Sequence, residues 1–276
     1  MKKRSLFLSF FTPMLFLTVG CNSDFLETEP TQFLTQEQLG QASANNPDIL
    51  RGTVSGIYSL MFETGTGGTT GHNDFGQKGV DIWTDMLCGD IALSQNTYNW
   101  YRNFVDYQSS TDFTRNECYI PWRYYYRIIR SVNLIIDGLG GNDGNPTLPS
   151  ARFVMGQAKA LRAHSYFYLT QLFQNEYNAD QEILPLYTSL GDVNGPKVKA
   201  SVIYDLIEKD LREAIVFLDG FTRDNKSQIN KPVAQTILAY ALAAKGAYGP
   251  AYTLANDVIT NGGFTPMQGT ELTGGF

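Results

Sequence analysis

Histidine is nearly absent from this chain of 276 residues, since it occurs only at positions 72 and 164. The sequence also lacks the His-Glu-x-x-His, Gly-x-Ser-x-Gly and Cys-x-x-Cys motifs, and it contains no EF-hand loop. These absences argue against metal-dependent, serine-nucleophile and thiol-redox enzymes, so we predict no metal and no cofactor. His164 lies in a predicted helix close to Arg162. We expect a structural role for the histidine and a helix-to-helix ion pair or hydrogen bond for the arginine.

Basic residues are in the minority, with 21 Lys and Arg against 27 Asp and Glu and a formal net charge of -6. Nucleic-acid binding requires a surplus of Lys and Arg to neutralise phosphates, so we predict no nucleic-acid partner. Aromatic residues, in contrast, make up 13% of the chain. This abundance suits either helix packing or a surface that stacks on flat ligands.

The apolar stretch near the N-terminus is too short and too broken for a membrane-spanning helix. It covers residues 6–19, is interrupted by Pro13 and follows three basic residues at positions 2–4. A positive start followed by a short apolar region is typical of a secretory leader. We therefore predict a signal peptide over residues 1–20.

A lipid-attachment motif follows the apolar stretch. Residues 17–21 (Leu-Thr-Val-Gly-Cys) resemble a bacterial lipobox, although threonine stands where leucine is commoner. They predict that Cys21 carries a lipid anchor. The next residue is Asn22 rather than Asp, so there is no simple signal for retention in the inner membrane. Residues 21–46 are mostly polar, and we interpret them as a lipid-anchored tether and lead-in.

The other two cysteines are Cys88 and Cys118. In an oxidising compartment they could form a disulfide, but their spacing does not require one. The sequence leaves both a disulfide and two free thiols open.

Apolar residues recur at helical spacing in six segments. We predict helices over residues 47–62, 121–139, 151–173, 201–218, 232–247 and 250–260. Ser150 and Ser201 are expected to cap two of them. Between the helices, we interpret residues 65–71 as a flexible glycine-rich loop and residues 182–199 as a loop. Residues 74–107 form the least regular and most aromatic stretch.

The helices come in pairs, as in repeat proteins. Ala239 and Leu242 fall on the close-packing positions of one tetratricopeptide-like helix, and Ala251 and Ala255 fall on those of its partner. Small residues at such positions let paired helices approach closely. We predict an all-α fold, a tetratricopeptide-like helical repeat solenoid with long decorated loops, over residues 47–276.

One short segment combines aromatic rings with side-chain amides. It contains Tyr98, Asn99, Trp100, Tyr101 and Asn103. Pyranose rings present apolar C–H faces that stack on aromatic rings, and their hydroxyls need amide or carboxylate partners. The segment predicts a glycan-binding site, and the alternative is that its rings pack against the helices.

Two carboxylates precede this segment. Asp81 and Asp85 are four residues apart and would share one face of a helix. We count Asp81 among the candidate glycan contacts. Because two carboxylates can catalyse glycoside hydrolysis, an anchored glycoside hydrolase is a further alternative. No neighbouring group that would tune the pKa of either residue is visible, which argues against catalysis.

Four segments share their order and spacing with one known family. They are Cys21 followed by residues 24–26 and Pro30; Trp122, Tyr125, Ile128 and Asn133; residues 156–169; and residues 202–211 followed by residues 231–244. Together they resemble the SusD/RagB family of glycan-capturing surface lipoproteins. The resemblance covers essentially the whole predicted mature chain.

The resemblance implies a non-catalytic protein that binds oligosaccharide and acts as a lid on a SusC-like, TonB-dependent transporter. It also implies that the Cys21 anchor lies in the outer membrane and faces the cell surface. In the family, the comparable N-terminal stretch often contributes a Trp and an Asn to the sugar site, which favours Trp100 together with Asn99 or Asn103. Family members are usually much longer, so this chain resembles the N-terminal half of one. An alternative function is a protein-binding lid with little glycan affinity of its own.

Overall fold

The computed structural model describes residue 46 and residues 48–274. Cys21, the predicted signal peptide and all of the predicted tether except residue 46 lie outside the described residues. Among the helices within the described range, none is long and apolar enough to cross a membrane.

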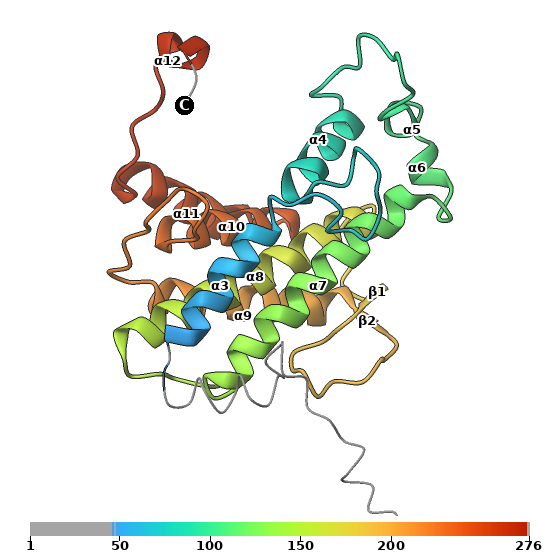
Figure 1. Ribbon diagram of the computed structural model, residues 1–276. Helices are drawn as coiled ribbons and strands as arrows, with labels where there is room; N and C mark the ends of the chain where they lie inside the picture. The colour runs from blue at the N-terminus through green and yellow to red at the C-terminus, as the bar shows by residue number, and fades with distance from the viewer. Residues whose placement is uncertain (1–45, 47, 275–276) are drawn as a thin grey trace, which may run out of the picture. The chain divides into compact units, whose positions relative to one another are not determined.

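The described chain is mostly α-helical and includes one antiparallel pair of short strands (Figure 1). The elements are α3 (Asp48–Leu60), α4 (Gly76–Cys88), α5 (Arg102–Val105), α6 (Gln108–Thr111), α7 (Asn116–Gly138), α8 (Pro149–Phe173), β1 (Glu182–Pro185), β2 (Lys197–Lys199), α9 (Ala200–Phe217), α10 (Lys231–Ala244), α11 (Tyr248–Asn261) and α12 (Gly269–Gly274). From α7 to α11, each helix contacts the next one along the chain. This serial packing is typical of a helical-repeat solenoid, so the predicted all-α architecture is confirmed.

Helix α8 lies at the centre of the core, where α3, α7 and α9 all contact it. Its middle turns carry the fully buried small residues Ala158, Ala160 and Ala163, which let neighbouring helices approach on several sides. A Cβ atom on Gly156 would lie 2.8 Å from Cγ of Leu218, so the end of α9 passes close to the α8 backbone. The middle of α8 is therefore buried on several faces, as is typical of a helix at the centre of a core.

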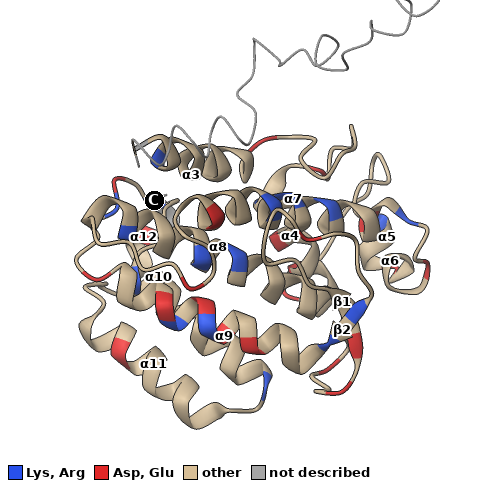
Figure 2. Cartoon of the chain, turned by 90° about the horizontal axis from the view of Figure 1, so that it is seen from below, with Lys and Arg blue, Asp and Glu red and all other residues tan. Residues whose placement is uncertain are grey.

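Two buried positive charges of α8 meet acidic residues of α9 (Figure 2). Arg162 donates two hydrogen bonds to Asp210, at 2.7 and 2.8 Å, and a third to Asn133 Oδ1 at 2.9 Å. Lys159 Nζ lies 2.6 Å from Glu213 and 3.6 Å from Asp210. The predicted helix-to-helix ion pair of Arg162 is therefore confirmed, and it joins α7, α8 and α9.

Several helix ends differ from the predicted ones. α7 begins before Pro121, which lies inside the helix. The N-caps of α8 and α9 are Leu148 and Lys199, and the predicted caps Ser150 and Ser201 already lie within the helices. A proline at the first helical position begins α8, because its fixed φ suits a helix and its missing N–H needs no partner there. Strand β2 runs directly into α9, which leaves no loop residue to cap it.

The α10–α11 pair follows the tetratricopeptide-like expectation in part. Ala239, Leu242 and Ala251 are buried, but Ala255 is exposed. The Asn230 side chain caps α10 by accepting a hydrogen bond from the Val233 amide at 3.3 Å. The two helices contact each other. In the later turns of α11, most side chains are exposed to solvent.

Two segments that we interpreted as irregular contain regular structure. Residues 182–199 include the β1–β2 pair, and residues 74–107 include α4 and α5. The loop interpretation of residues 182–199 was wrong at β1 and β2, which tertiary contacts stabilise, whereas α4 contains both Asp81 and Asp85, as their expected shared helix face requires. Gly76 and Gly79 weaken the local helix signal of α4. Gly76 is nevertheless needed, because it has φ 71° and a Cβ atom there would meet the Met61 carbonyl oxygen.

The glycine-rich loop over residues 65–71 is organised around one buried carboxylate. Asp74 is 1% exposed. Its Oδ1 accepts from the Gly67 amide at 2.8 Å, and its Oδ2 accepts from the Thr69 amide and hydroxyl, both at 2.9 Å. These three hydrogen bonds hold together the segment that we interpreted as a flexible loop. The loop holds a defined conformation next to α4.

Candidate functional site

Helix α4 is joined to the helical core by a chain of polar contacts. Tyr125 donates to Gln77 Oε1 at 3.2 Å, and Gln77 in turn donates to Asp81 Oδ1 at 2.9 Å. Tyr168 of α8 also donates to Asp81 Oδ1, at 3.1 Å. Burial, reinforced by the Asp81 carboxylate, raises the pKa of Tyr168, so the hydroxyl stays protonated and can donate this bond. The structure thus places Asp81 against α8.

Two predicted glycan-binding rings, Tyr98 and Trp100, lie together on the surface with His72. The Tyr98 and Trp100 ring centroids are 5.3 Å apart, and those of His72 and Trp100 are 4.3 Å apart. Tyr98 is 72% exposed and Trp100 is 47% exposed. Asn99, between them in sequence, is also exposed. We call His72, Tyr98, Asn99 and Trp100 the ring group. Its aromatic faces can contact the C–H groups of a ligand, and its amide can form hydrogen bonds with the same ligand.

The other predicted residues of this segment are turned toward the protein. Tyr101 is half-buried, its ring centroid lies 6.5 Å from that of Phe104, and burial raises its pKa. Asn103 is half-buried and donates to Glu117 Oε1 at 2.9 Å. Asn99 is therefore the amide of the segment that shares the exposed surface with Trp100.

The backbone around the ring group is strained. Asn99, Tyr101 and Tyr107 have φ values of 59°, 63° and 54°, in the left-handed region that residues other than glycine rarely adopt. Such conformations persist only where surrounding contacts impose them, and they cluster at functional sites. In the same region Trp83 stacks on Phe104, with ring centroids 4.9 Å apart.

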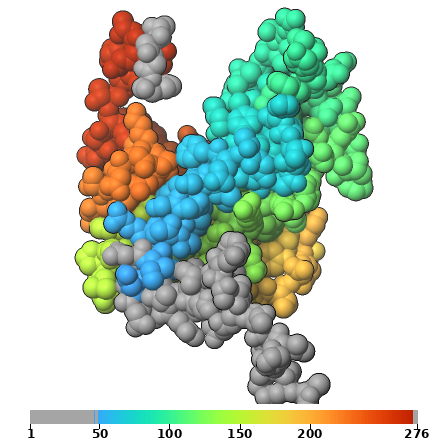
Figure 3. Space-filling model, in the orientation of Figure 1, coloured from blue at the N-terminus to red at the C-terminus, as the bar shows by residue number. Residues whose placement is uncertain are grey.

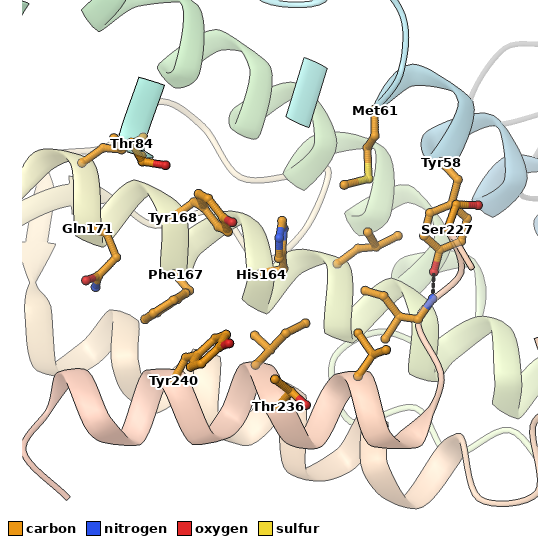
Figure 4. Close-up of a pocket in the computed structure, with 15 residues that line it drawn as sticks. Tyr58, Met61, Thr84, His164, Phe167, Tyr168, Gln171, Ser227, Thr236 and Tyr240 are labelled. Atoms are coloured by element: carbon orange, nitrogen blue, oxygen red, sulfur yellow. Dashed lines mark hydrogen bonds between the residues drawn. The ribbon is translucent and has the colours of Figure 1, made fainter. Parts of the chain in front are cut away.

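A second feature is a cavity of about 520 Å³ between α3, α4, α8 and α10, which we call the α8–α10 cavity (Figure 4). Figure 3 shows the surface hollowed between the segments that carry α4 and α10. The Tyr58 hydroxyl at one end accepts from the Ile229 amide at 2.9 Å. Most of the lining is apolar or aromatic, including Phe167, Tyr168 and Tyr240. The lining comes from separate elements, so sequence spacing gave no signal for it.

His164 borders the α8–α10 cavity, and its Nδ1 is covered without a hydrogen-bond partner among the described residues. Burial lowers its pKa from 6.5 to about 4, so the ring is neutral at pH 7. Its nearest ring is Tyr168, with centroids 4.7 Å apart. A neutral histidine among tyrosines fits the structural role that we expected for it.

The structure has free thiols at both Cys88 and Cys118. Cys88 lies with Asp85 and Asp90 in a group whose ligand atoms are within 4.8 Å of one another. A hydrogen bond from the Cys88 thiol to the Asp85 carbonyl oxygen, at 3.5 Å, already accounts for part of this arrangement. Burial raises the pKa of the Cys118 thiol, which donates to the Ser109 carbonyl oxygen at 3.2 Å.

Comparisons with known proteins agree with this architecture. Residues 69–245 match a SusD-like family that is described as "Starch-binding associating with outer membrane". The chain is also similar to SusD-like protein P25 of Formosa agariphila, with 23% identity over 206 residues, which cover 74% of this chain and 37% of that protein.

Two solved structures have a similar fold. One is a SusD-like carbohydrate binding protein from Bacteroides vulgatus, with a TM-score of 0.69 and 20% identity over 82% of this chain and 47% of the other. The second is a laminarin binding SusD-like protein, with a TM-score of 0.58 and 19% identity over 79% of this chain and 44% of the other. The chain spans less than half the length of these relatives. Since the family match covers more than half of this chain, the protein belongs to the SusD-like family.

Proposed function

We propose that this protein binds oligosaccharide at the outer membrane and delivers it to a SusC-like, TonB-dependent transporter. The observation that carries the proposal is the ring group, in which Tyr98 and Trp100 are 72% and 47% exposed. Large rings exposed together on a surface mark a binding site, and the C–H faces of sugars cover such rings. The carbohydrate-binding and laminarin-binding descriptions of the similar structures support the same ligand class.

The proposal includes an anchor that holds this site near its transporter. Cys21 carries the lipid, and residues 22–46 act as a leash on the cell-surface side of the outer membrane. A tethered partner meets its target at a high effective concentration, so capture and delivery do not require a large permanent interface.

We propose binding without hydrolysis. Asp81, one of the two carboxylates considered for catalysis, accepts hydrogen bonds from Gln77 and Tyr168 and so links α4 to the core. A sensitive reducing-sugar assay tests this point. Turnover of laminarin or starch that Asp81→Asn abolishes would contradict it.

Affinity electrophoresis tests glycan binding directly. We expect laminarin or soluble starch in a native gel to retard the protein, and Trp100→Ala to weaken the interaction about two- to tenfold because one stacking surface is lost. Tyr252→Ala is a matched control, because Tyr252 lies on α11 and is 72% exposed. Equal retardation of Trp100→Ala and the unmodified protein would count against the proposed site.

The exposed face of α11 favours a second candidate function, a protein-binding lid. Tyr248, Tyr252 and Ile259 are 71%, 72% and 73% exposed. Helical solenoids often use such faces to bind proteins. A pull-down with a SusC-like transporter separates the two functions. Tyr252→Ala lowers recovery of the transporter if the lid function holds, whereas Trp100→Ala lowers only glycan binding if the first proposal holds.

A further inference from the structure

A second and larger cavity adjoins the α8–α10 cavity, since Thr84, Gln171 and Leu172 line both. It has a volume of about 1060 Å³ and is lined by α4, α5, α6, the first turns of α7 and the end of α8. We call it the α4–α7 cavity. None of the four residues of the ring group lines it. Pockets for small ligands typically hold about 300–1000 Å³, so this cavity is large enough for a ligand.

Two buried polar groups in its wall have no hydrogen-bond partner among the described residues. They are the indole Nε1 of Trp83 and the hydroxyl of Ser109, in residues that are only 2% and 8% exposed. An indole N–H can only donate, whereas a hydroxyl can donate or accept. Buried polar groups are nearly always paired in folded proteins, so two unpaired ones in one wall require an explanation.

The rest of the wall combines aromatic faces with an acceptor. Phe113 is 89% exposed and Tyr119 is 45% exposed, while Trp122 contributes a third ring. Glu117 supplies a carboxylate, which Asn103 orients through its hydrogen bond at 2.9 Å. Rings beside hydrogen-bonding groups suit a ligand that has both C–H faces and hydroxyls.

We propose that the α4–α7 cavity is a second saccharide subsite, in which sugar hydroxyls pair with the Trp83 indole N–H and the Ser109 hydroxyl. The inference rests on the proposed glycan-binding function and adds a second, concave site to it. Both polar atoms are covered by neighbouring protein atoms, so a ligand reaches them after a side-chain rotation or a shift of α5 and α6. These are helices of four residues that begin after Tyr101 and Tyr107, two of the residues with positive φ.

An apolar ligand fits this cavity less well. It would cover the rings but would leave the Trp83 and Ser109 groups unpaired and would desolvate Glu117. A polyhydroxylated ligand provides oxygen atoms for the two unpaired groups and hydroxyl donors for the carboxylate. The observed set of side chains therefore favours a saccharide.

Matched substitutions test the subsite. Phe113→Ala is expected to weaken binding of laminarin- or starch-derived oligosaccharides about two- to tenfold. Phe62→Ala is the control, because Phe62 is 68% exposed and follows α3. Ser109→Ala is expected to weaken binding while leaving thermal stability unchanged or higher, because it removes a buried hydroxyl that has no partner. If Ser109 had only a structural role, its substitution would not weaken oligosaccharide binding while leaving thermal stability unchanged or higher.

Cys88 provides an independent readout, because its thiol is exposed at the cavity wall. Bound oligosaccharide is expected to slow alkylation of Cys88, measured by mass spectrometry of the peptide that carries it. If the protein binds glycan but Phe113→Ala and Ser109→Ala bind as the unmodified protein does and Cys88 is not protected, the subsite is wrong and the proposed function stands. If no glycan binds at all, both are wrong.

Discussion

The half-buried His164 makes a specific prediction about acid stability. Burial lowers the pKa of His164 from 6.5 to about 4. Between these values the unfolded chain binds a proton at this position and the folded chain does not, so stability rises with pH. The loss of folding stability that comes from His164 is absent above about pH 6.5 and complete below about pH 4. A shift of about 2.5 units corresponds to at most ~3.4 kcal/mol, and we expect a loss of about 2 kcal/mol between pH 7 and pH 4.5.

Urea unfolding between pH 4.5 and pH 7.5 measures this effect. His164→Gln removes the titrating ring, so its free energy of unfolding should fall less steeply with acidification than that of the unmodified protein. His72→Gln is the matched control, since it replaces the one other histidine, which is exposed. It should keep the steep dependence. A His164→Gln variant whose pH dependence parallels that of the unmodified protein would show that His164 is not the source of the acid sensitivity.

Three further predictions concern the core and the anchor. Asp210→Asn removes the countercharge of the buried Arg162, so the free energy of unfolding in urea should fall by about 3–5 kcal/mol; a loss below ~1 kcal/mol would contradict the pairing. Gly156→Ala should lower the thermal midpoint, because overpacking that costs about 1–3 kcal/mol exceeds the gain in helix propensity. Gly52→Ala on α3, where an added Cβ atom meets nothing within 4 Å, should raise the midpoint instead. Cys21→Ser should abolish metabolic labelling with palmitate and move the protein from the membrane to the soluble fraction, and unchanged membrane association would contradict lipid anchoring.

The long helices could be predicted because their apolar spacing continues over several turns. In α8, residues 154–169 keep this pattern with small residues between the large ones, and the structure buries most of them. α4 could not be predicted in the same way. Its glycines at positions 76 and 79 weaken the local signal, and its contacts run to Tyr125 and Tyr168, which are distant in sequence. The β1–β2 pair also depends on residues separated in sequence, since its two short strands pair across the loop of residues 186–196.

The candidate site shows the same limit. Tyr98 and Trp100 could be selected because residue type alone indicates what they can bind. His72 could not, because it joins Trp100 through the fold of the loop that Asp74 organises. Asp81 has suitable chemistry for a sugar contact, but the orientation of α4 directs its carboxylate to α8. Composition therefore indicates the ligand class, whereas the set of contacting side chains depends on tertiary structure.

Isothermal titration calorimetry with laminarin- and starch-derived oligosaccharides measures directly whether the ring group binds glycan. We expect saturable binding by the unmodified protein, about two- to tenfold weaker binding by Trp100→Ala, and unchanged binding by Tyr252→Ala, whose side chain lies on α11. Binding that is equally strong in Trp100→Ala, or no saturable binding to any oligosaccharide of the panel, would contradict glycan binding by the ring group.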